Sequence, residues 1–87
     1  MHIEIYSKDS CGQCVQAKNM IKQKCYGYDE YILGKDVTIE DLQNRVKESN
    51  SNKPLRTAPQ IFIDGNHLGA FDDLVTFLRT ADAACDA

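Results

Sequence analysis

A strand, a polar loop and a pair of cysteines follow one another in HIEIYSKDSCGQC, residues 2–14. Ile3 and Ile5 alternate with polar or aromatic neighbours, and this period of two is typical of a β-strand. The polar tetrapeptide SKDS that comes next predicts a loop. Cys11 and Cys14 form a C-x-x-C motif directly after it. The first cysteine is therefore expected to follow a strand.

An amphipathic helix is predicted to begin at the cysteine pair. Apolar side chains recur there at helical spacing, with polar residues on the other faces. The stripe consists of Cys14, Ala17, Ile21 and Cys25. We expect Gly27 to end this helix, and we expect Cys25 to be a small buried hydrophobic residue. Cys85 lies in the C-terminal tail, where an exposed thiol is expected.

The rest of the chain predicts three more strands and two more helices. Residues 28–33 have the aromatic and β-branched character of a strand. A helix over about residues 39–48 has Thr38 as its candidate N-cap. The Asp-Gly pair at 64–65 supplies the positive φ angles of a two-residue hairpin turn between two short strands. Apolar spacing over residues 71–78 then predicts a closing helix.

These elements give the order β-α-β-α-β-β-α in one α/β domain that spans residues 1–87. A chain of 87 residues builds one modest core. The first βαβ unit should have a right-handed crossover, so helices should cover both faces of the sheet. We expect a four-stranded mixed sheet flanked by three helices, an arrangement that is similar to the thioredoxin fold.

Composition and charge narrow the classes of function. The net charge of -3 argues against nucleic acid as a partner. No stretch approaches the roughly 18 apolar residues of a membrane span, and the first residues do not have the pattern of a targeting segment. We therefore expect a cytoplasmic protein that binds neither nucleic acid nor membrane. We also expect a monomer.

A cysteine at the point where a loop enters a helix is suited to redox chemistry. Unpaired backbone N–H groups and the positive end of the helix dipole favour thiolate over thiol there. Cys14 lies about one turn further on and faces the core, within reach of Cys11. We predict that Cys11 attacks disulfides and that Cys14 resolves the product. Lys8 adds a positive charge near the thiolate.

Half of a zinc site is the alternative interpretation of the C-x-x-C motif. Zinc would need two further ligands from Cys25, Cys85, His2 and His67. None of these four is paired with another at a spacing typical of zinc sites. We therefore favour redox chemistry without a bound metal, and we assign no role to either histidine.

Three segments resemble the signature segments of glutaredoxins. They are KDSCGQC at residues 8–14, TAPQIF at 57–62 and GAFDD at 69–73. The resemblance covers almost the whole chain and is closest to the small dithiol glutaredoxins of bacteria and their viruses. It implies an enzyme that reduces protein disulfides and glutathione mixed disulfides, with glutathione as electron donor and no tightly bound cofactor. Ribonucleotide reductase is the common protein client of the family.

The resemblance also implies a glutathione site. Pro59 would follow a cis peptide bond, and the backbone of Ala58 would pair with glutathione like an added strand. Asp72 and Asp73 would hold the γ-glutamyl end, while Lys8 would meet the glycine carboxylate. The same two aspartates also fit N-cap and first-turn positions alone. The full implied set is Lys8, Gln13, Thr57, Ala58, Pro59, Asp72 and Asp73.

Three positions depart from the glutaredoxin pattern. Gly12 and Gln13 stand where proline and tyrosine are usual, and Ala70 replaces a glycine before the last helix. Gly12 removes the restraint on φ that proline provides, so the nucleophile loop should be looser. Gly12 also leaves two alternatives open: a glutathione-ligated iron-sulfur cluster held between two chains, and a thioredoxin-like reductase that a flavoprotein reduces.

Overall fold

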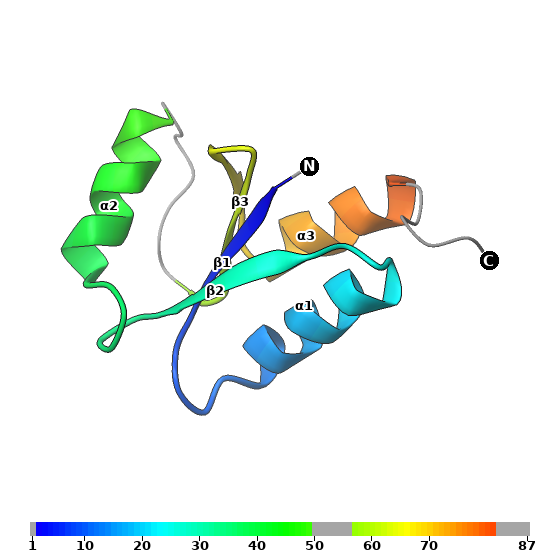
Figure 1. Cartoon of the computed structure of the whole chain (residues 1–87), viewed down its shortest axis with the longest axis horizontal. Coiled ribbons are helices and arrows are strands. Elements are labelled where there is room, and N and C mark those ends of the chain that lie inside the picture. Colours follow the sequence, from blue (N-terminus) through cyan, green and yellow to red (C-terminus); the bar gives the residue numbers. More distant parts are fainter. Residues whose placement is uncertain (1, 50–56, 82–87) are drawn as a thin grey trace.

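The computed structural model describes residues 2–49 and 57–81. Seven elements follow one another: β1 (Ile3–Ser7), α1 (Gly12–Gln23), β2 (Tyr28–Ile32), α2 (Ile39–Glu48), β3 (Gln60–Ile63), β4 (Asn66–Gly69) and α3 (Phe71–Thr80). The predicted order β-α-β-α-β-β-α is confirmed (Figure 1). The expectation for Cys85 lies outside the described residues.

The four strands form one mixed sheet in the order β2-β1-β3-β4. Strand β1 is parallel to β2 and antiparallel to β3, and β3 is antiparallel to β4. Asp64 and Gly65 join β3 to β4 with φ angles of 51° and 84°, as expected for a two-residue hairpin turn. Because β1 is central, the loop that follows it emerges from the middle of the sheet.

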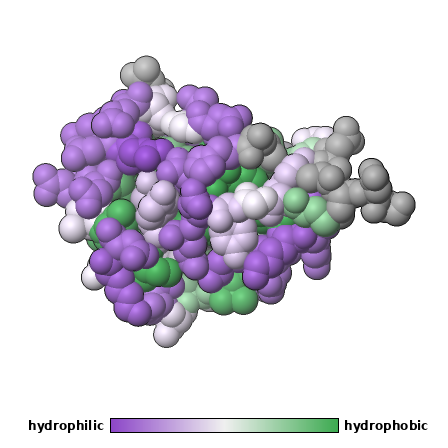
Figure 2. Space-filling model, in the orientation of Figure 1, coloured by the Kyte–Doolittle hydropathy of each residue, from purple (hydrophilic) through white to green (hydrophobic). Residues whose placement is uncertain are grey.

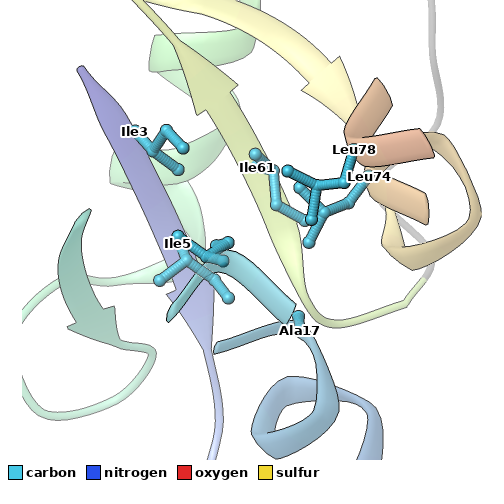
Figure 3. Close-up of a cluster of buried hydrophobic side chains, with 7 residues drawn as sticks. Ile3, Ile5, Ala17, Ile61, Leu74 and Leu78 are labelled. Carbon is cyan, nitrogen blue, oxygen red and sulfur yellow. The ribbon is translucent and has the colours of Figure 1, made fainter. Parts of the chain in front are cut away.

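Helices cover both faces of this sheet, as predicted. Figure 1 shows α1 and α3 on one side and α2 on the other. Alternate residues of β1 supply the two cores, because successive side chains of a strand point to opposite faces. Figure 3 shows the core under α1 and α3. That core consists of Ile3, Ile5, Ala17, Ile21, Ile61, Leu74 and Leu78, and the core under α2 consists of Tyr6, Leu42, Val46 and Phe62.

The end of α1 differs from the prediction. The helix ends at Gln23, and Cys25 adopts the left-handed conformation with φ 61°. The N–H groups of Cys25 and of the next residue donate to carbonyls of the last helical turn, at 2.8 and 3.2 Å. This is the Schellman motif, in which glycine is the usual left-handed residue. The expectation that Gly27 ends the helix was therefore wrong, and so was that of a buried Cys25, which is exposed.

The predicted cap of α2 is confirmed. Thr38 Oγ1 accepts a hydrogen bond from the Asp41 N–H at 3.1 Å. The Thr38 N–H donates in return to Asp41 Oδ2 at 2.9 Å, which completes a capping box. These hydrogen bonds to Thr38 hold the pKa of the Asp41 carboxyl below its usual value. The start of α2 is thus fixed by residues that are adjacent in the sequence.

The surface in Figure 2 is mainly hydrophilic, with small hydrophobic areas between the polar ones. Val15 and Ile39 are large hydrophobic residues with exposed side chains, at 52% and 62% of their accessible area. Within residues 2–49 and 57–81, no helix has the length and apolar character needed to span a membrane.

Candidate active site

Cys11 and Cys14 are joined by a disulfide at the N-terminus of α1, with their Cα atoms 5.2 Å apart. Cys11 is the N-cap residue of the helix, with extended backbone angles. Its Sγ accepts a hydrogen bond from the Cys14 N–H at 3.2 Å. The N-terminal N–H groups of a helix carry partial positive charge, and this position therefore stabilises a thiolate on Cys11 after reduction.

The two sulfur-bearing residues differ in their access to solvent. Cys14 is only 2% exposed, whereas Cys11 is partly exposed. The sequence predicted this difference, because Cys14 begins the apolar stripe of α1 and Cys11 precedes the helix. A substrate therefore reaches Cys11 more easily than Cys14.

The loop before β3 lies against the cysteine pair. The Ala58-Pro59 peptide bond is cis, as the resemblance implied, and Pro59 is fully buried. The Ala58 carbonyl oxygen lies 3.8 Å from Cys11 Sγ. A disulfide sulfur has no proton to donate, so this is a van der Waals contact. The fold thus brings together two segments that are 47 residues apart in the chain.

A cavity of about 390 Å³ lies on one side of the cysteine pair. Both cysteines line it, together with Lys8 from the loop after β1, Lys18 from α1 and Glu30 from β2. A second cavity of about 130 Å³ contains Lys8 again. Its lining also includes Thr57 and Ala58. Lys8 therefore lines both the cavity beside the cysteine pair and the cavity beside the cis-proline loop.

Gln60 holds the cis-proline loop in place from the buried start of β3. It is 1% exposed, and its Nε2 donates to the Thr57 carbonyl oxygen at 2.7 Å. Its Oε1 lies 2.8 Å from His67 Nε2. A buried amide needs partners for its polar atoms, and here the partners join the loop to β4. Gln60 was not predicted from the sequence to have this role, although a polar residue at the start of an apolar strand was an available signal.

The start of α3 carries Asp72 and Asp73 side by side in the chain. Asp73 Oδ2 accepts the N–H of Ala70, the N-cap residue, at 3.1 Å. Alanine has no side-chain acceptor, so only this half of a capping box is formed. Asp72 is exposed. Asp73 thus has a structural role in the helix cap, and its contact with a ligand stays a prediction, while the Asp72 side chain projects to solvent.

Gly69 lets the Asp73 carboxylate fold back onto this cap. Its φ angle is 138°, a conformation that residues with a side chain rarely adopt. A Cβ at Gly69 would overlap the Asp73 carboxylate. The glycine that precedes α3 is therefore required both by its backbone angle and by the close approach of Asp73.

Gly12 and Gln13 occupy the first turn of α1 and are exposed. A Cβ at Gly12 would meet no atom within 4 Å. Gln13 is absent from the residues that line the cavity beside the cysteines. Two of the three positions that depart from the glutaredoxin pattern thus have exposed side chains or none, and Gly12 lines the cavity with open space around it.

A polar cluster beside the cysteines was missed by the sequence analysis. Glu30 Oε2 accepts a hydrogen bond from Ser7 Oγ at 2.7 Å and forms an ion pair with Lys18 Nζ at 2.8 Å. The hydrogen bond from Lys18 is the main cause of a lowered pKa for Glu30; burial acts in the opposite direction. The available signal was the charged residue between Tyr28 and Ile32, on the face of β2 that otherwise carries apolar or aromatic side chains.

The described residues contain no group of three or more histidine, cysteine, aspartate or glutamate side chains placed to hold a metal ion. His2 is exposed and its Nε2 lies 3.2 Å from Asp29 Oδ2.

Fold and cysteine pair together define the class of this protein as a thiol-disulfide oxidoreductase with the thioredoxin fold. The glutaredoxin family model matches residues 3–68. The chain belongs to the glutaredoxin family.

Relatives and solved structures agree with this assignment. Glutaredoxin 1 from Rickettsia prowazekii is 39% identical over 72 residues, which cover 83% of this chain and 72% of the relative. The structure of reduced Escherichia coli glutaredoxin has a TM-score of 0.72 at 27% identity, covering 91% of this chain and 94% of that one. A buckwheat glutaredoxin-glutathione complex has a TM-score of 0.68 at 26% identity, and the match covers 88% of this chain and 67% of that one.

One relative is much longer. Hybrid peroxiredoxin hyPrx5 from Haemophilus influenzae is 36% identical over 72 residues, which are 83% of this chain but 27% of that protein. The chain thus spans about a quarter of this relative, and the similarity concerns that part alone.

Proposed function

We propose that this protein reduces protein disulfides and glutathione mixed disulfides with glutathione as the electron donor. The observation that carries the proposal is the Cys11–Cys14 disulfide at the N-terminus of α1, in contact with Ala58 of the cis-proline loop. Glutathione dependence is typical of the family. A related buckwheat glutaredoxin forms a complex with glutathione, which supports the same ligand here.

The proposed reaction begins on the more exposed sulfur. Reduced Cys11, as thiolate, attacks one sulfur of the client disulfide, whose other sulfur leaves and takes up a proton. Cys14 then loses its proton and attacks Cys11 Sγ, which releases the second client thiol and forms the Cys11–Cys14 disulfide. Two glutathione molecules restore the dithiol. The first attacks Cys11 Sγ, which releases Cys14 and forms a mixed disulfide with Cys11. The second attacks the glutathione sulfur of that mixed disulfide, which releases Cys11 and oxidised glutathione.

Glutathione is proposed to lie between the cis-proline loop and the starts of α1 and α3. The Ala58 backbone, beside Pro59, would pair with the peptide. Thr57 lines the cavity that also contains Lys8, whose ammonium group suits the glycine carboxylate. Asp72 is exposed at the first turn of α3 and suits the ligand's ammonium group, while Asp73 shapes that turn. Gln13 is proposed as a peripheral contact from α1.

We further propose that the protein acts as a monomer in the cytoplasm on disulfide-containing clients, of which ribonucleotide reductase is the candidate that the family suggests. The proposed cycle consumes two glutathione molecules per disulfide, and the reducing cytoplasm supplies glutathione. This requirement supports the proposed location.

The experiment that tests the function compares wild type, Cys11→Ser and Cys14→Ser. The assay is glutathione-dependent reduction of a small glutathione mixed disulfide, followed by reduction of a protein disulfide. We expect Cys11→Ser to lose both activities. Cys14→Ser should retain the first, which needs one sulfur, and lose the second, which needs both. Turnover by Cys11→Ser at the wild-type rate would overturn the assignment.

A further inference from the structure

A charged pair that the reaction does not use lies in the cavity beside the disulfide. Lys18 Nζ and Glu30 Oε2 are 2.8 Å apart, and the two side chains are only 25% and 27% exposed. Glu30 Oε2 also accepts the Ser7 hydroxyl at 2.7 Å, and Ser7 is 1% exposed. The same cavity is lined by Cys11 and Cys14. The pair is thus fixed in position and partly shielded from water next to the reacting sulfurs.

The secondary structure explains why the cation of this pair lies close to the cysteines. Cys14 and Lys18 are four residues apart on α1, so they lie on the same face of the helix, one turn from each other. Glu30 is on β2, on the face of the sheet that α1 covers, between Tyr28 and Ile32. Its carboxylate draws the Lys18 side chain along the helix toward the sheet rather than toward solvent.

The two charges of the pair have opposite effects on the stability of a neighbouring thiolate. The Lys18 ammonium lowers the energy of a thiolate, and the Glu30 carboxylate raises it. Partial burial weakens solvent screening, so both effects extend across the cavity. While the two charges are paired, they oppose each other at the sulfurs.

We propose that the Lys18–Glu30 pair tunes the stability of the active-site thiolate, with Glu30 limiting the stabilisation that Lys18 would otherwise provide. Both are positioning residues that act through the electrostatic field at Cys11. The proposal rests on the role of Cys11 proposed above. The proposal predicts that loss of the negative charge at Glu30 and loss of the positive charge at Lys18 shift the redox equilibrium in opposite directions.

The Lys18–Glu30 pair supplies neither electrons nor protons to the reduction of the disulfide. Dithiothreitol supplies two electrons to the Cys11–Cys14 bond, which breaks as dithiothreitol closes to its own cyclic disulfide. Of the two thiol protons that dithiothreitol loses, Cys14 takes up one and the other is released to solvent, so that Cys11 is left as a thiolate. Lys18 and Glu30 exchange neither protons nor electrons, and they change only the free energy of the reduced product.

Other charged groups around the pair stay the same in the proposed variants. Lys8 and Asp9 in the loop after β1 line the same cavity, and Lys22 on α1 lies near Glu30. The Ser7 hydroxyl faces Glu30 from β1 and carries no charge. A difference between single variants at Lys18 and Glu30 therefore does not come from a change in these other groups.

The test uses Glu30→Gln, Lys18→Met and the double variant. The Cys11 thiol pKa is measured from the pH dependence of thiolate absorbance and alkylation, and the reduction equilibrium is measured against dithiothreitol. We expect Glu30→Gln to lower the Cys11 pKa by about half a unit, and Lys18→Met to raise it by a similar amount. Half a unit corresponds to roughly a threefold change in the reduction equilibrium, in favour of the reduced form for Glu30→Gln.

Two controls separate charge from structure. The double variant Lys18→Met with Glu30→Gln removes both charges, and its Cys11 pKa should return to within about 0.2 units of wild type, as expected when opposite effects cancel. Glu4→Gln breaks the ion pair between Glu4 and Arg45 on the α2 side of the sheet. That variant should lose stability with no change in the Cys11 pKa.

Shifts of the same sign in both single variants would overturn the proposal, as would unchanged pKa values in both. Dithiothreitol replaces glutathione in this assay, so a protein that does not use glutathione can still pass the test. Conversely, glutathione-dependent turnover in wild type with no response to either charge change would leave the proposed function standing and refute the tuning role.

Discussion

Replacing Gly69 by alanine is expected to disrupt the junction between β4 and α3. Gly69 has a φ angle of 138°, and a Cβ there would overlap the carboxylate of Asp73. That carboxylate accepts the Ala70 N–H at 3.1 Å and caps α3. The substitution therefore imposes two separate costs, a strained backbone angle and a displaced cap.

The size of the effect follows from these two costs. A residue with a side chain in a sparsely populated backbone region costs about 1–3 kcal/mol. Loss of a side-chain cap costs about 1 kcal/mol. The free energy of unfolding should therefore fall by about 2–4 kcal/mol, a large fraction of the 5–15 kcal/mol typical of a domain. For a chain of 87 residues, the lower limit corresponds to a fall in Tm of at least about 8 °C.

Urea unfolding of four proteins measures these costs separately: wild type, Gly69→Ala, Asp73→Ala and the double variant. In the Asp73→Ala background the added methyl group no longer meets a carboxylate, so Gly69→Ala should cost about 1 kcal/mol less than it does in wild type. The apparent KM for glutathione in Gly69→Ala should rise, because the first turn of α3 is part of the proposed ligand site.

Gly27→Ala is the matched control. A Cβ at Gly27 would meet no atom within 4 Å, and its φ angle is outside the region that favours glycine. It should change the free energy of unfolding by less than about 1 kcal/mol. If Gly69→Ala cost no more than this control, the strain assigned to position 69 would be refuted. If its cost were the same with and without Asp73, the overlap with the capping carboxylate would be refuted.

Two further predictions concern the first turn of α1 and the pair next to the cysteines. Gly12→Ala should raise the free energy of unfolding by about 0.4–1 kcal/mol in urea titrations, because the new Cβ meets no atom and the unfolded chain loses freedom; a destabilised variant would contradict this. The pKa of Glu30 is lowered from 4.5 in the folded protein, chiefly by the hydrogen bond from Lys18. Its stabilising effect should therefore be complete above pH 4.5 and disappear as the pH falls through the lower, folded pKa. The stability difference between wild type and Glu30→Gln, measured from pH 7 down to pH 3, should narrow below pH 4.5, and a constant difference would contradict the assignment.

Local sequence patterns predicted most elements of the fold, because the signals that define them lie within a few residues. The Thr38 cap of α2 and the Asp-Gly hairpin turn are examples. The end of α1 was mispredicted for a related reason. Cys25 adopts the left-handed conformation that glycine usually supplies, so the nearest glycine, at position 27, indicated a boundary that is too late.

The candidate site was predictable to the extent that its chemistry is local. Cys11 and Cys14 share one helix start, and the difference in their exposure follows from the apolar stripe of α1. The cis peptide bond before Pro59 came from the resemblance to glutaredoxins, since the surrounding residues do not favour it over trans. The sequence left open whether Asp73 caps the helix or contacts a ligand; the hydrogen bond from Ala70 shows the capping role, and the ligand contact stays a prediction.

The sequence by itself determined the order of the elements, the alternation that makes β1 a strand, and the placement of a cysteine at a helix N-terminus. These are consequences of periodicity and of chemistry between near neighbours. Only the tertiary structure decided that Ala58 lies against Cys11 and that Glu30 meets Ser7 and Lys18 beside the disulfide. The physical reason is that these contacts join residues far apart in the chain, whose proximity depends on how β1, β2 and β3 pair and on how α1 packs across them.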